Sequence, residues 1–459
     1  MLTGISKIHF IGIGGAGMSA LACVLLEQGL QVTGSDLKPS KTSAWLESKG
    51  AKIHFGHDAA NLGDAEAIVV STAIHPGNPE VEAALAKGLK KLHRSDVNAY
   101  LLNRASGIAV AGAHGKTTTT SMIGLVLKSG GLDPTIIIGG EVDYLNGNAA
   151  LGQGKYLVSE ADESDGSFLS LRPAIAIVTN VENDHMDHYG TMENIRKAFR
   201  EFLENLDEET GVGIVCNDNE NIRMIIKDIK RKIITYGIDG KADYNAANIV
   251  TERNATYFDL LKDGELLVKV ELAVPGRHNV LNATATIIAA IEAGLTPQQA
   301  ATGLLDFHGA KRRFDTTGRE KGVWVVDDYA HHPTEIATTL IAARQTAPTR
   351  LICTFQPHRY SRTQLLQKEF GAAFGEADLL VLTDIYAAGE DPIEGVDGTT
   401  ILNQVTEQTG QKVAYIKERK AVAPYLASIV QDGDLVLTMG AGDIWQTGGE
   451  LLELLRKQN

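Results

Sequence analysis

The sequence predicts an α/β protein built from three domains. A chain of 459 residues is too long for one ordinary hydrophobic core. Short β-rich runs alternate with helical stretches, which is typical of parallel α/β domains. Three times an apolar strand runs into a turn of glycine or polar residues: 7–11 before 12–17, 107–111 before 112–116, and 322–326 before 327–331. These restarts predict domains at residues 1–104, 105–311 and 312–459.

Composition narrows the class of protein. Hydrophobic residues make up 44% of the chain and charged residues 22%, the balance of a soluble globular protein. The net charge is −14, and no long cluster of lysine and arginine stands out, which argues against a nucleic-acid partner. Anionic substrates must therefore be held by nearby hydrogen-bond donors and cations, because the electrostatic field of the whole protein does not attract them.

The cysteines and the apolar N-terminal run predict a cytoplasmic protein. Cys23, Cys216 and Cys353 form no C-x-x-C pair, which argues against disulfides and structural zinc. Residues 8–26 are apolar, but they contain His9 and four glycines, at positions 12, 14, 15 and 17. A buried strand, a glycine turn and a helix explain this run better than a signal peptide or a membrane span.

The first domain begins with a glycine turn that resembles a dinucleotide fingerprint. Gly12, Gly14 and Gly17 follow a strand in the G-x-G-x-x-G spacing, and Asp36 lies nineteen residues beyond Gly17. This segment alone favours an NAD-dependent dehydrogenase. The same turn suits the diphosphate of a UDP-sugar equally well, with Asp36 accepting from a ribose hydroxyl or a uracil N–H. The fingerprint therefore predicts a diphosphate ligand without identifying it.

The second domain begins with a phosphate loop at residues 111–120. It follows a buried strand and opens a helix, so its glycines can turn backbone N–H groups toward phosphate oxygens. Lys116 can bridge the β and γ phosphates, and a threonine hydroxyl can bind Mg²⁺. The strict motif needs glycine at position 110, where Val110 stands, so this loop is a variant whose first glycine is Gly112.

Two acidic segments follow this loop. The strand at residues 156–160 ends on Glu160, and residues 174–179 lead into a run that contains His185 and His188. Carboxylates at the ends of strands beside a phosphate loop predict a site for Mg²⁺, with Mn²⁺ possible. No cysteine lies at a spacing that would complete a zinc site with these histidines. Further on, residues 243–274 predict a small antiparallel insertion with a hairpin turn at 262–264.

Nine short motifs, spread over essentially the whole chain, closely resemble the Mur ligase family. The Asp-Tyr-Ala-His-His-Pro run and the Gln-Pro-His-Arg-Tyr-Ser-Arg run are the most specific. The motifs are residues 12–18, 112–118, 160–165, 183–187, 276–282, 312–314, 327–333, 355–363 and 383–390. The resemblance implies a Rossmann-like N-terminal domain for a UDP-sugar, a central P-loop ATPase-like domain for ATP, and a Rossmann-like C-terminal domain that closes with the amino acid.

The resemblance also implies roles for individual residues. The UDP-sugar would be bound by Gly14, Gly15, Ala16, Gly17, Met18, Ser19, Asp36, Ser71 and Thr72. ATP would be bound by Gly112, Ala113, His114, Gly115, Lys116, Thr117, Thr118, His278, Asn279, Asn282, Arg313 and Asp328. The metal would be held by Thr117, Glu160 and His185, and the amino acid by Tyr329, His331, Arg359 and Arg362. The catalytic group would be Lys116, Glu160, His185, Asp328, His331, Arg359 and Arg362.

The implied activity is ATP-dependent joining of L-alanine to UDP-N-acetylmuramate in peptidoglycan precursor synthesis, by a monomer or homodimer. Amide formation from a free carboxylate needs activation, which the γ-phosphate supplies as an acyl phosphate, with release of ADP and phosphate. Arg359 and Arg362 can pair bidentately with a carboxylate. His331 or His332 can receive the ammonium proton, while the other can cap the helix beginning near Pro333. A family member that attaches a preformed tripeptide remains an alternative, as does the dehydrogenase.

Overall fold

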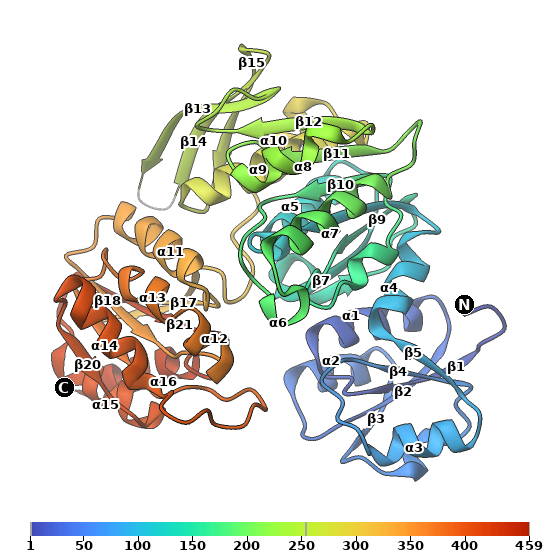
Figure 1. Ribbon diagram of the computed structural model, residues 1–459, viewed down its shortest axis with the longest axis horizontal. Coiled ribbons are helices and arrows are strands. Elements are labelled where there is room, and N and C mark those ends of the chain that lie inside the picture. The colour runs from blue at the N-terminus through green and yellow to red at the C-terminus, as the bar shows by residue number, and fades with distance from the viewer. Residues whose placement is uncertain (1, 253–254, 459) are drawn as a thin grey trace. The chain divides into compact units, whose positions relative to one another are not determined.

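The computed structural model describes residues 2–252 and 255–458, which form two compact units with three β-sheets (Figure 1). The first unit comprises residues up to 249 together with 258–271 and 280–307. The second comprises residues 250–257, 272–279 and those from 308 onward. None of the helices in the described ranges combines the length and the apolar character needed to cross a membrane.

The first sheet is fully parallel and has the order β3-β2-β1-β4-β5. Its central strand β1 buries Ile8, Phe10 and Ile11 completely. The apolar run at residues 8–26 is therefore a strand, a turn and a helix, as predicted. The strands are β1 (Lys7–Ile11), β2 (Gln31–Asp36), β3 (Lys52–Phe55), β4 (Ala67–Val70) and β5 (Lys90–His93). The helices are α1 (Ala16–Glu27), α2 (Lys41–Ser48), α3 (Pro79–Ala86) and α4 (Arg94–Leu102).

The strand order of this sheet creates a ligand position. Successive connections leave β1 toward β2 on one side and reach β4 on the other, so the order reverses between β1 and β4. In open parallel sheets, ligands bind outside the carboxyl ends of the strands at such a switch point. The glycine turn at residues 12–17 follows β1, and Ser71 and Thr72 follow β4. These predicted UDP-sugar residues therefore meet at one edge of the sheet.

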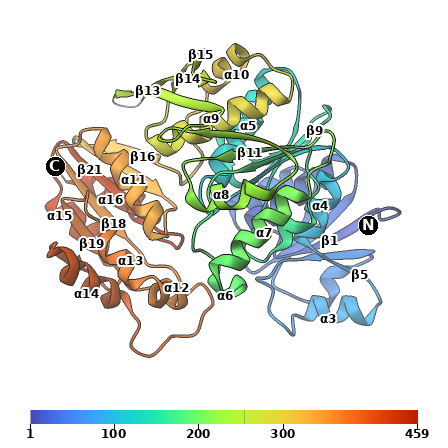
Figure 2. The same ribbon diagram turned by 45° about the horizontal axis from the view of Figure 1, so that its top comes forward.

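The second sheet has ten strands in the order β15-β14-β13-β12-β11-β10-β6-β9-β7-β8. Helices α5 and α10 pack on each other, as do α7 and α8, and Figure 2 shows the two pairs on opposite sides of β11. The strands are β6 (Ser106–Ala111), β7 (Thr135–Val142), β8 (Gly147–Ala150), β9 (Tyr156–Glu160), β10 (Ile175–Val178), β11 (Val212–Cys216), β12 (Lys232–Gly237), β13 (Tyr244–Glu252), β14 (Ala255–Lys262) and β15 (Glu265–Leu272). The helices are α5 (Lys116–Ser129), α6 (Met186–Tyr189), α7 (Met192–Glu204), α8 (Glu220–Ile225), α9 (Arg277–Glu292) and α10 (Pro297–Leu304).

The predicted insertion corresponds to β13, β14 and β15. Strands β14 and β15 are joined by a two-residue turn at Asp263 and Gly264, whose φ angles are 51° and 87°. Positive φ at both central residues is the geometry of a hairpin turn that matches the twist of the strands. The hairpin predicted at residues 262–264 is confirmed.

The third sheet has the order β16-β17-β21-β18-β19-β20, and both of its faces are buried. Leu351, Cys353 and Phe355 pack on the side of α11, α13 and α14, whereas Ile352 packs on the side of α15 and α16. Burial on both faces explains why the inner strands β18, β19 and β21 are largely apolar. The strands are β16 (Asp315–Glu320), β17 (Val323–Asp328), β18 (Arg350–Phe355), β19 (Leu379–Leu382), β20 (Val413–Tyr415) and β21 (Asp434–Met439). The helices are α11 (Pro333–Gln345), α12 (Tyr360–Leu365), α13 (Gln367–Ala372), α14 (Gly398–Thr409), α15 (Arg419–Ile429) and α16 (Gln446–Lys457).

Candidate active site

The phosphate loop follows the central strand β6, which lies between β10 and β9. Two of its glycines are required by their surroundings. A Cβ on Gly112, whose φ is 134°, would lie 2.1 Å from Thr179 Oγ1, and one on Gly115, whose φ is 85°, would lie 2.8 Å from Asn282 Oδ1. The close approaches explain why the first glycine of this variant is Gly112. They also place Asn282, a predicted ATP residue, beside the loop.

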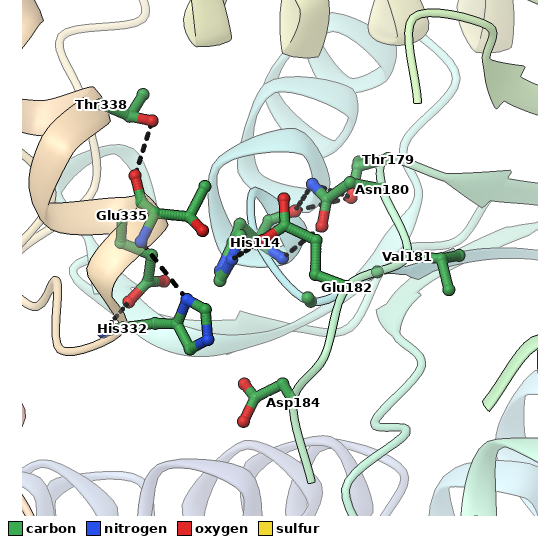
Figure 3. Close-up of polar contacts among 12 residues, drawn as sticks. His114, Thr179, Asn180, Val181, Glu182, Asp184, His332, Glu335 and Thr338 are labelled. Carbon is green, nitrogen blue, oxygen red and sulfur yellow. Dashed lines mark hydrogen bonds and ion pairs between the residues drawn. The ribbon is translucent and has the colours of Figure 1, made fainter. Parts of the chain in front are cut away.

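Residues that follow β10 hold the loop in shape. His114 N–H donates to Asn180 Oδ1 at 2.9 Å, and the His114 carbonyl accepts from Asn180 Nδ2 at 2.9 Å. Thr179 Oγ1 donates to the same carbonyl at 2.6 Å. Figure 3 shows both side chains directed at His114. The sequence did not single out Thr179 and Asn180 as site residues, although they immediately precede a predicted acidic segment.

The first turn of α5 is suited to an anion. Gly115 is its N-cap and provides no side-chain hydrogen bond to the N–H groups of that turn. Backbone donors at the N-terminus of a fourteen-residue helix favour a phosphate group. Lys116, Thr117 and Thr118 open this helix. The loop therefore fits a polyphosphate on its own geometry.

Lys116 is held by an acidic partner. Its Nζ donates to Glu163 Oε1 at 2.7 Å and to the carbonyl oxygens of Gly112 and Ala113. Burial alone would lower the pKa of Lys116, but Glu163, with Asp162 and Glu160, raises it. The lysine is therefore a permanent cation at this site.

Glu160 and Glu163, three residues apart, point to different partners. Glu160 Oε1 accepts from the N–H of Gly139 at 2.7 Å, whereas Glu163 lies beside Lys116 and 3.7 Å from His185 Nε2. Glu160 and His185, together with Thr117, were the predicted metal residues. Glu163 was noted in sequence only as part of an acidic run, so its contact with the lysine is a finding of the structure.

The glycine turn of the first domain is bound to strand β2. Gly12 N–H and Ile13 N–H donate to the Ser35 carbonyl at 2.8 and 3.0 Å, and Gly14 N–H donates to Asp36 Oδ2 at 2.8 Å. Asp36 therefore supports the turn directly, in addition to any contact with a ligand.

Two of the residues predicted for the UDP-sugar are buried. Met18 and Ser19 lie inside, and Ser19 Oγ donates to the Ala16 carbonyl at 3.0 Å. Asn148 of β8 donates to the same carbonyl at 2.7 Å and to Ser19 Oγ at 3.0 Å. This part of α1 packs on β7 and β8, whereas Gly15 and Ala16 are exposed.

Arg94 connects the glycine turn with the acidic loop. Its Nη2 pairs with Asp162 Oδ2, and a Cβ on Gly17 would lie 3.3 Å from its Nη1. Sequence reasoning missed Arg94. A single arginine outside the recognised motifs gives no signal of its own.

In the second unit, Asp328 organises the turn after β17. Its Oδ2 accepts from Phe314 N–H and its Oδ1 from Ala330 N–H, both at 2.8 Å. Burial raises the pKa of Asp328 to about 6, although the cation of Arg313 opposes the change. Burial, with the Arg313 cation, also lowers the pKa of His278 to about 4. Asn279 donates from Nδ2 to the Pro275 carbonyl at 2.7 Å.

Four rings gather at the carboxyl ends of the third sheet. The Tyr329 and His331 ring centroids are 5.3 Å apart, and those of His331 and His358 are 6.1 Å apart. His358 stacks on Tyr386 with centroids 5.6 Å apart. Burial, together with His331 and Arg362, lowers the pKa of His358 to about 3. His358 and Tyr386 lie inside recognised motifs but had been given no role.

The adjacent histidines after β17 have separate positions. His332 is the N-cap of α11 and accepts from the N–H of Thr334 at 3.4 Å, while Glu335 accepts from the His332 N–H at 3.2 Å (Figure 3). His331 instead joins the aromatic group and places Nδ1 3.0 Å from the Tyr329 carbonyl. The structure therefore assigns capping to His332 and places His331 among the rings at the carboxyl ends of the third sheet.

Arg359 and Arg362 flank the start of α12. Arg359 has a φ of 70°, in the left-handed region that non-glycine residues rarely adopt. Its Nε lies 4.0 Å from Glu390 Oε1, and 45% of its side chain is exposed. Arg362 Nη1 lies 3.4 Å from His358 Nδ1. Strained backbone at an exposed arginine is common at functional positions.

Comparison with known proteins covers all three sheets. Three consecutive descriptions match: "Mur ligase family, catalytic domain" at residues 7–106, "Mur ligase middle domain" at 110–290, and "Mur ligase, glutamate ligase domain" at 312–442. The UDP-N-acetylmuramate–L-alanine ligase of Pelotomaculum thermopropionicum is 49% identical, and that of Desulforamulus reducens is 50% identical. Each alignment covers 98% of both chains.

Solved structures agree with these sequence matches. The UDP-N-acetylmuramate–alanine ligase of Thermotoga maritima has a TM-score of 0.85 at 29% identity, covering 99% of this chain and 100% of that one. A murein peptide ligase from Psychrobacter arcticus has a TM-score of 0.74 at 26% identity over 99% and 100% of the two chains. These matches confirm the predicted three-domain α/β fold. The chain belongs to the Mur ligase family.

Proposed function

We propose that this protein is an ATP-dependent ligase that joins L-alanine to the carboxylate of UDP-N-acetylmuramate, a step of peptidoglycan precursor synthesis. ATP is converted to ADP and phosphate by way of an acyl phosphate on the sugar acid. The observation that carries the proposal is the full-length similarity, at 49–50% identity, to enzymes named for this reaction. We also propose that it acts in the cytoplasm.

The phosphate loop supports ATP as the energy source. Its glycines lie where a Cβ would collide, its helix N-terminus is open to an anion, and Lys116 is a fixed cation. Charge spreads over the phosphoryl group during transfer, so a lysine close to it stabilises the transition state. The remaining ATP residues proposed are His114, Thr118, His278, Asn279, Asn282, Arg313 and Asp328.

The acidic loop suits a divalent cation. Glu163 Oε2 is buried and has no hydrogen-bond partner, and Glu160 ends the neighbouring strand, so carboxylate oxygens of the kind Mg²⁺ prefers are present. Thr117, Glu160 and His185 are the proposed ligands of Mg²⁺ or Mn²⁺. When bound, the metal neutralises charge on the phosphates. The orphan oxygen also makes Glu163 an additional candidate.

The other two substrates are proposed to bind at the two Rossmann-like sheets. The UDP-sugar is proposed to bind at the switch point between β1 and β4, where residues 12–17, Ser71 and Thr72 meet. L-alanine is proposed to bind with its carboxylate on Arg359, which is exposed, and Arg362, which is half-buried, because guanidinium groups bind carboxylates bidentately. His331 is proposed to take the proton from the ammonium group. The boundaries at residues 104 and 312 remain part of this proposal.

The earlier alternatives fit less well. The murein peptide ligase is 26% identical, against 49–50% for the alanine-adding relatives. The dehydrogenase reading depended on the glycine turn and Asp36 alone, whereas the family similarity extends over all three sheets. In addition, Asp36 supports the turn itself.

A phosphate-release assay tests the proposal. The protein is incubated with ATP, UDP-N-acetylmuramate and, in separate reactions, L-alanine, glycine, L-serine or a preformed tripeptide. Release is expected with L-alanine, and it should stop with EDTA and return with Mg²⁺ or Mn²⁺. Release with the tripeptide but not with L-alanine would transfer the protein to the peptide-recycling branch. NADH binding without any ATP binding would restore the dehydrogenase.

A further inference from the structure

The phosphate-loop lysine makes its hydrogen bonds within its own chain. An ammonium group has three N–H donors. Lys116 directs them at the carbonyls of Gly112 and Ala113, the latter at 3.3 Å, and at Glu163 Oε1 at 2.7 Å. Polyphosphate binding needs at least one of these donors, so one of the three contacts must be exchanged.

The contact with Glu163 is the one that can be exchanged. The two carbonyls belong to the phosphate loop, so they stay near Lys116 whenever the loop keeps its shape. Glu163 comes from a different loop, after β9. A phosphate oxygen carries the same charge as a carboxylate oxygen and makes the same charge-assisted hydrogen bond with an ammonium group. It therefore replaces Glu163 most directly.

Glu163 itself is arranged in a way that packing does not explain. Its side chain is 4% exposed, and its Oε2 is buried without a hydrogen-bond partner. The Tyr189 hydroxyl donates to the Glu163 carbonyl at 2.6 Å, which anchors the backbone at this position. A buried carboxylate with one oxygen unpaired opposes stability unless a cation compensates it. The fold keeps this carboxylate aimed at Lys116.

The other carboxylates of the loop are engaged elsewhere. Glu160 accepts from Gly139 N–H at 2.7 Å, Asp162 pairs with Arg94, and Asp165 accepts from Ser167 N–H at 3.0 Å. The contact with Lys116 is therefore specific to one carboxylate and is not a general effect of an acidic segment.

We propose that Glu163 is a positioning residue that takes the place of the nucleotide's terminal phosphates. It holds Lys116 ready in the nucleotide-free protein and competes with polyphosphate for the ammonium group. The inference rests on the proposed function, since it assumes that ATP binds this loop. By this competition Glu163 helps to set the affinity for ATP, and it helps the product nucleotide to leave after the reaction.

Calorimetric titration of the full-length protein with metal-free nucleotides tests the proposal. Glu163→Gln keeps the size of the side chain and removes its charge, so ATP in EDTA should bind about 10-fold more tightly than to wild type. AMP lacks the phosphates that a phosphate-loop lysine contacts, so its affinity should not change. Asp165→Asn removes one charge from the same loop without touching Lys116, and it should leave both affinities at wild-type values.

Damage to the fold weakens binding, so tighter binding is a result that a merely structural role does not produce. Wild-type or weaker ATP affinity in a folded Glu163→Gln protein overturns the inference, as does equal tightening of ATP and AMP. If the glutamine variant does not fold, Glu163→Asp draws the carboxylate back from Lys116 and should tighten ATP binding in the same direction. Absence of ATP binding to the wild type in a parallel titration with Mg²⁺ would refute the proposed function itself, which separates the two failures.

Discussion

Glu80 is a buried carboxylate whose removal tests how the first domain is stabilised. It lies in the first turn of α3 and is fully buried. Ser35 Oγ donates to its Oε2 at 2.6 Å, Asn61 Nδ2 donates to its Oε1 at 2.6 Å, and His57 Nδ1 lies 3.0 Å from Oε2. Burial alone would raise the pKa of Glu80, but these bonds and His9 bring it down to about 2 from an ordinary 4.5.

The shifted pKa gives the size and the pH dependence of the effect. One pH unit corresponds to about 1.4 kcal/mol, so the difference amounts to about 3 kcal/mol of folding free energy. The folded-state pKa is depressed, so the contribution is complete above pH 4.5 and is lost as the pH falls toward 2. Glu80→Gln should therefore destabilise the first domain by about 3 kcal/mol at pH 7, and by about 2 kcal/mol at pH 3.5.

The assay uses a local fluorescent probe. Trp45 lies in the first domain, so urea unfolding is followed by its fluorescence in a Trp324→Phe, Trp445→Phe background. Glu82→Gln is the matched control, because Glu82 is exposed and lies in the same first turn of α3. Both variants therefore lose a similar interaction with the dipole of α3, and this contribution cancels in the comparison. Equal losses for the two variants, or a Glu80→Gln loss that is the same at both pH values, would refute the reasoning.

Three further predictions concern the proposed site. Lys116→Ala should reduce turnover at least about 1000-fold in the phosphate-release assay. It should also lower the free energy of unfolding in urea by about 3 kcal/mol, because it leaves the buried Glu163 carboxylate without its cation. Adding Glu163→Gln should restore stability but not turnover. Arg359→Ala should raise KM for L-alanine about 10-fold or more and KM for ATP less than about 2-fold; equal effects would remove it from the amino-acid pocket. The depressed pKa of His278 means that wild type loses stability as pH falls from 6.5 toward 4. Between pH 7 and pH 5, the free energy of unfolding of His278→Gln should fall by about 1–2 kcal/mol less than that of the wild type. Identical pH profiles of stability for the two proteins would contradict this.

The strands and loops that begin the first two domains were predictable from sequence, as was the strand at residues 156–160. Residues 7–11 and 156–160 are β1 and β9 with the predicted bounds, and the predicted strand at 107–111 differs from β6 by one residue. Strands of parallel sheets are buried on both faces, so they appear as continuous apolar runs. The loops after them carry glycine and charged residues, which mark the carboxyl edge of the sheet where ligands bind.

Features set by tertiary contact were not predictable. Strand β16 at Asp315–Glu320 contains no apolar side chain and pairs antiparallel with β17, so no apolar pattern in the sequence predicted it. Glu160 and Glu163 are the same residue type three positions apart, and only the path of the loop decides which one reaches Lys116. The separate positions of His331 and His332 likewise depend on where α11 begins.

The packing of α1 on β7 and β8 has a consequence for dissecting the protein. Asn148 lies in a strand more than a hundred residues away and donates hydrogen bonds to the Ala16 carbonyl and to Ser19 Oγ. Ser19 is completely buried. A fragment that stops near residue 104 would expose this apolar helix face and leave the Ala16 carbonyl without Asn148. The first domain is therefore not expected to fold by itself. A soluble fragment should extend through residue 307, where the first compact unit ends.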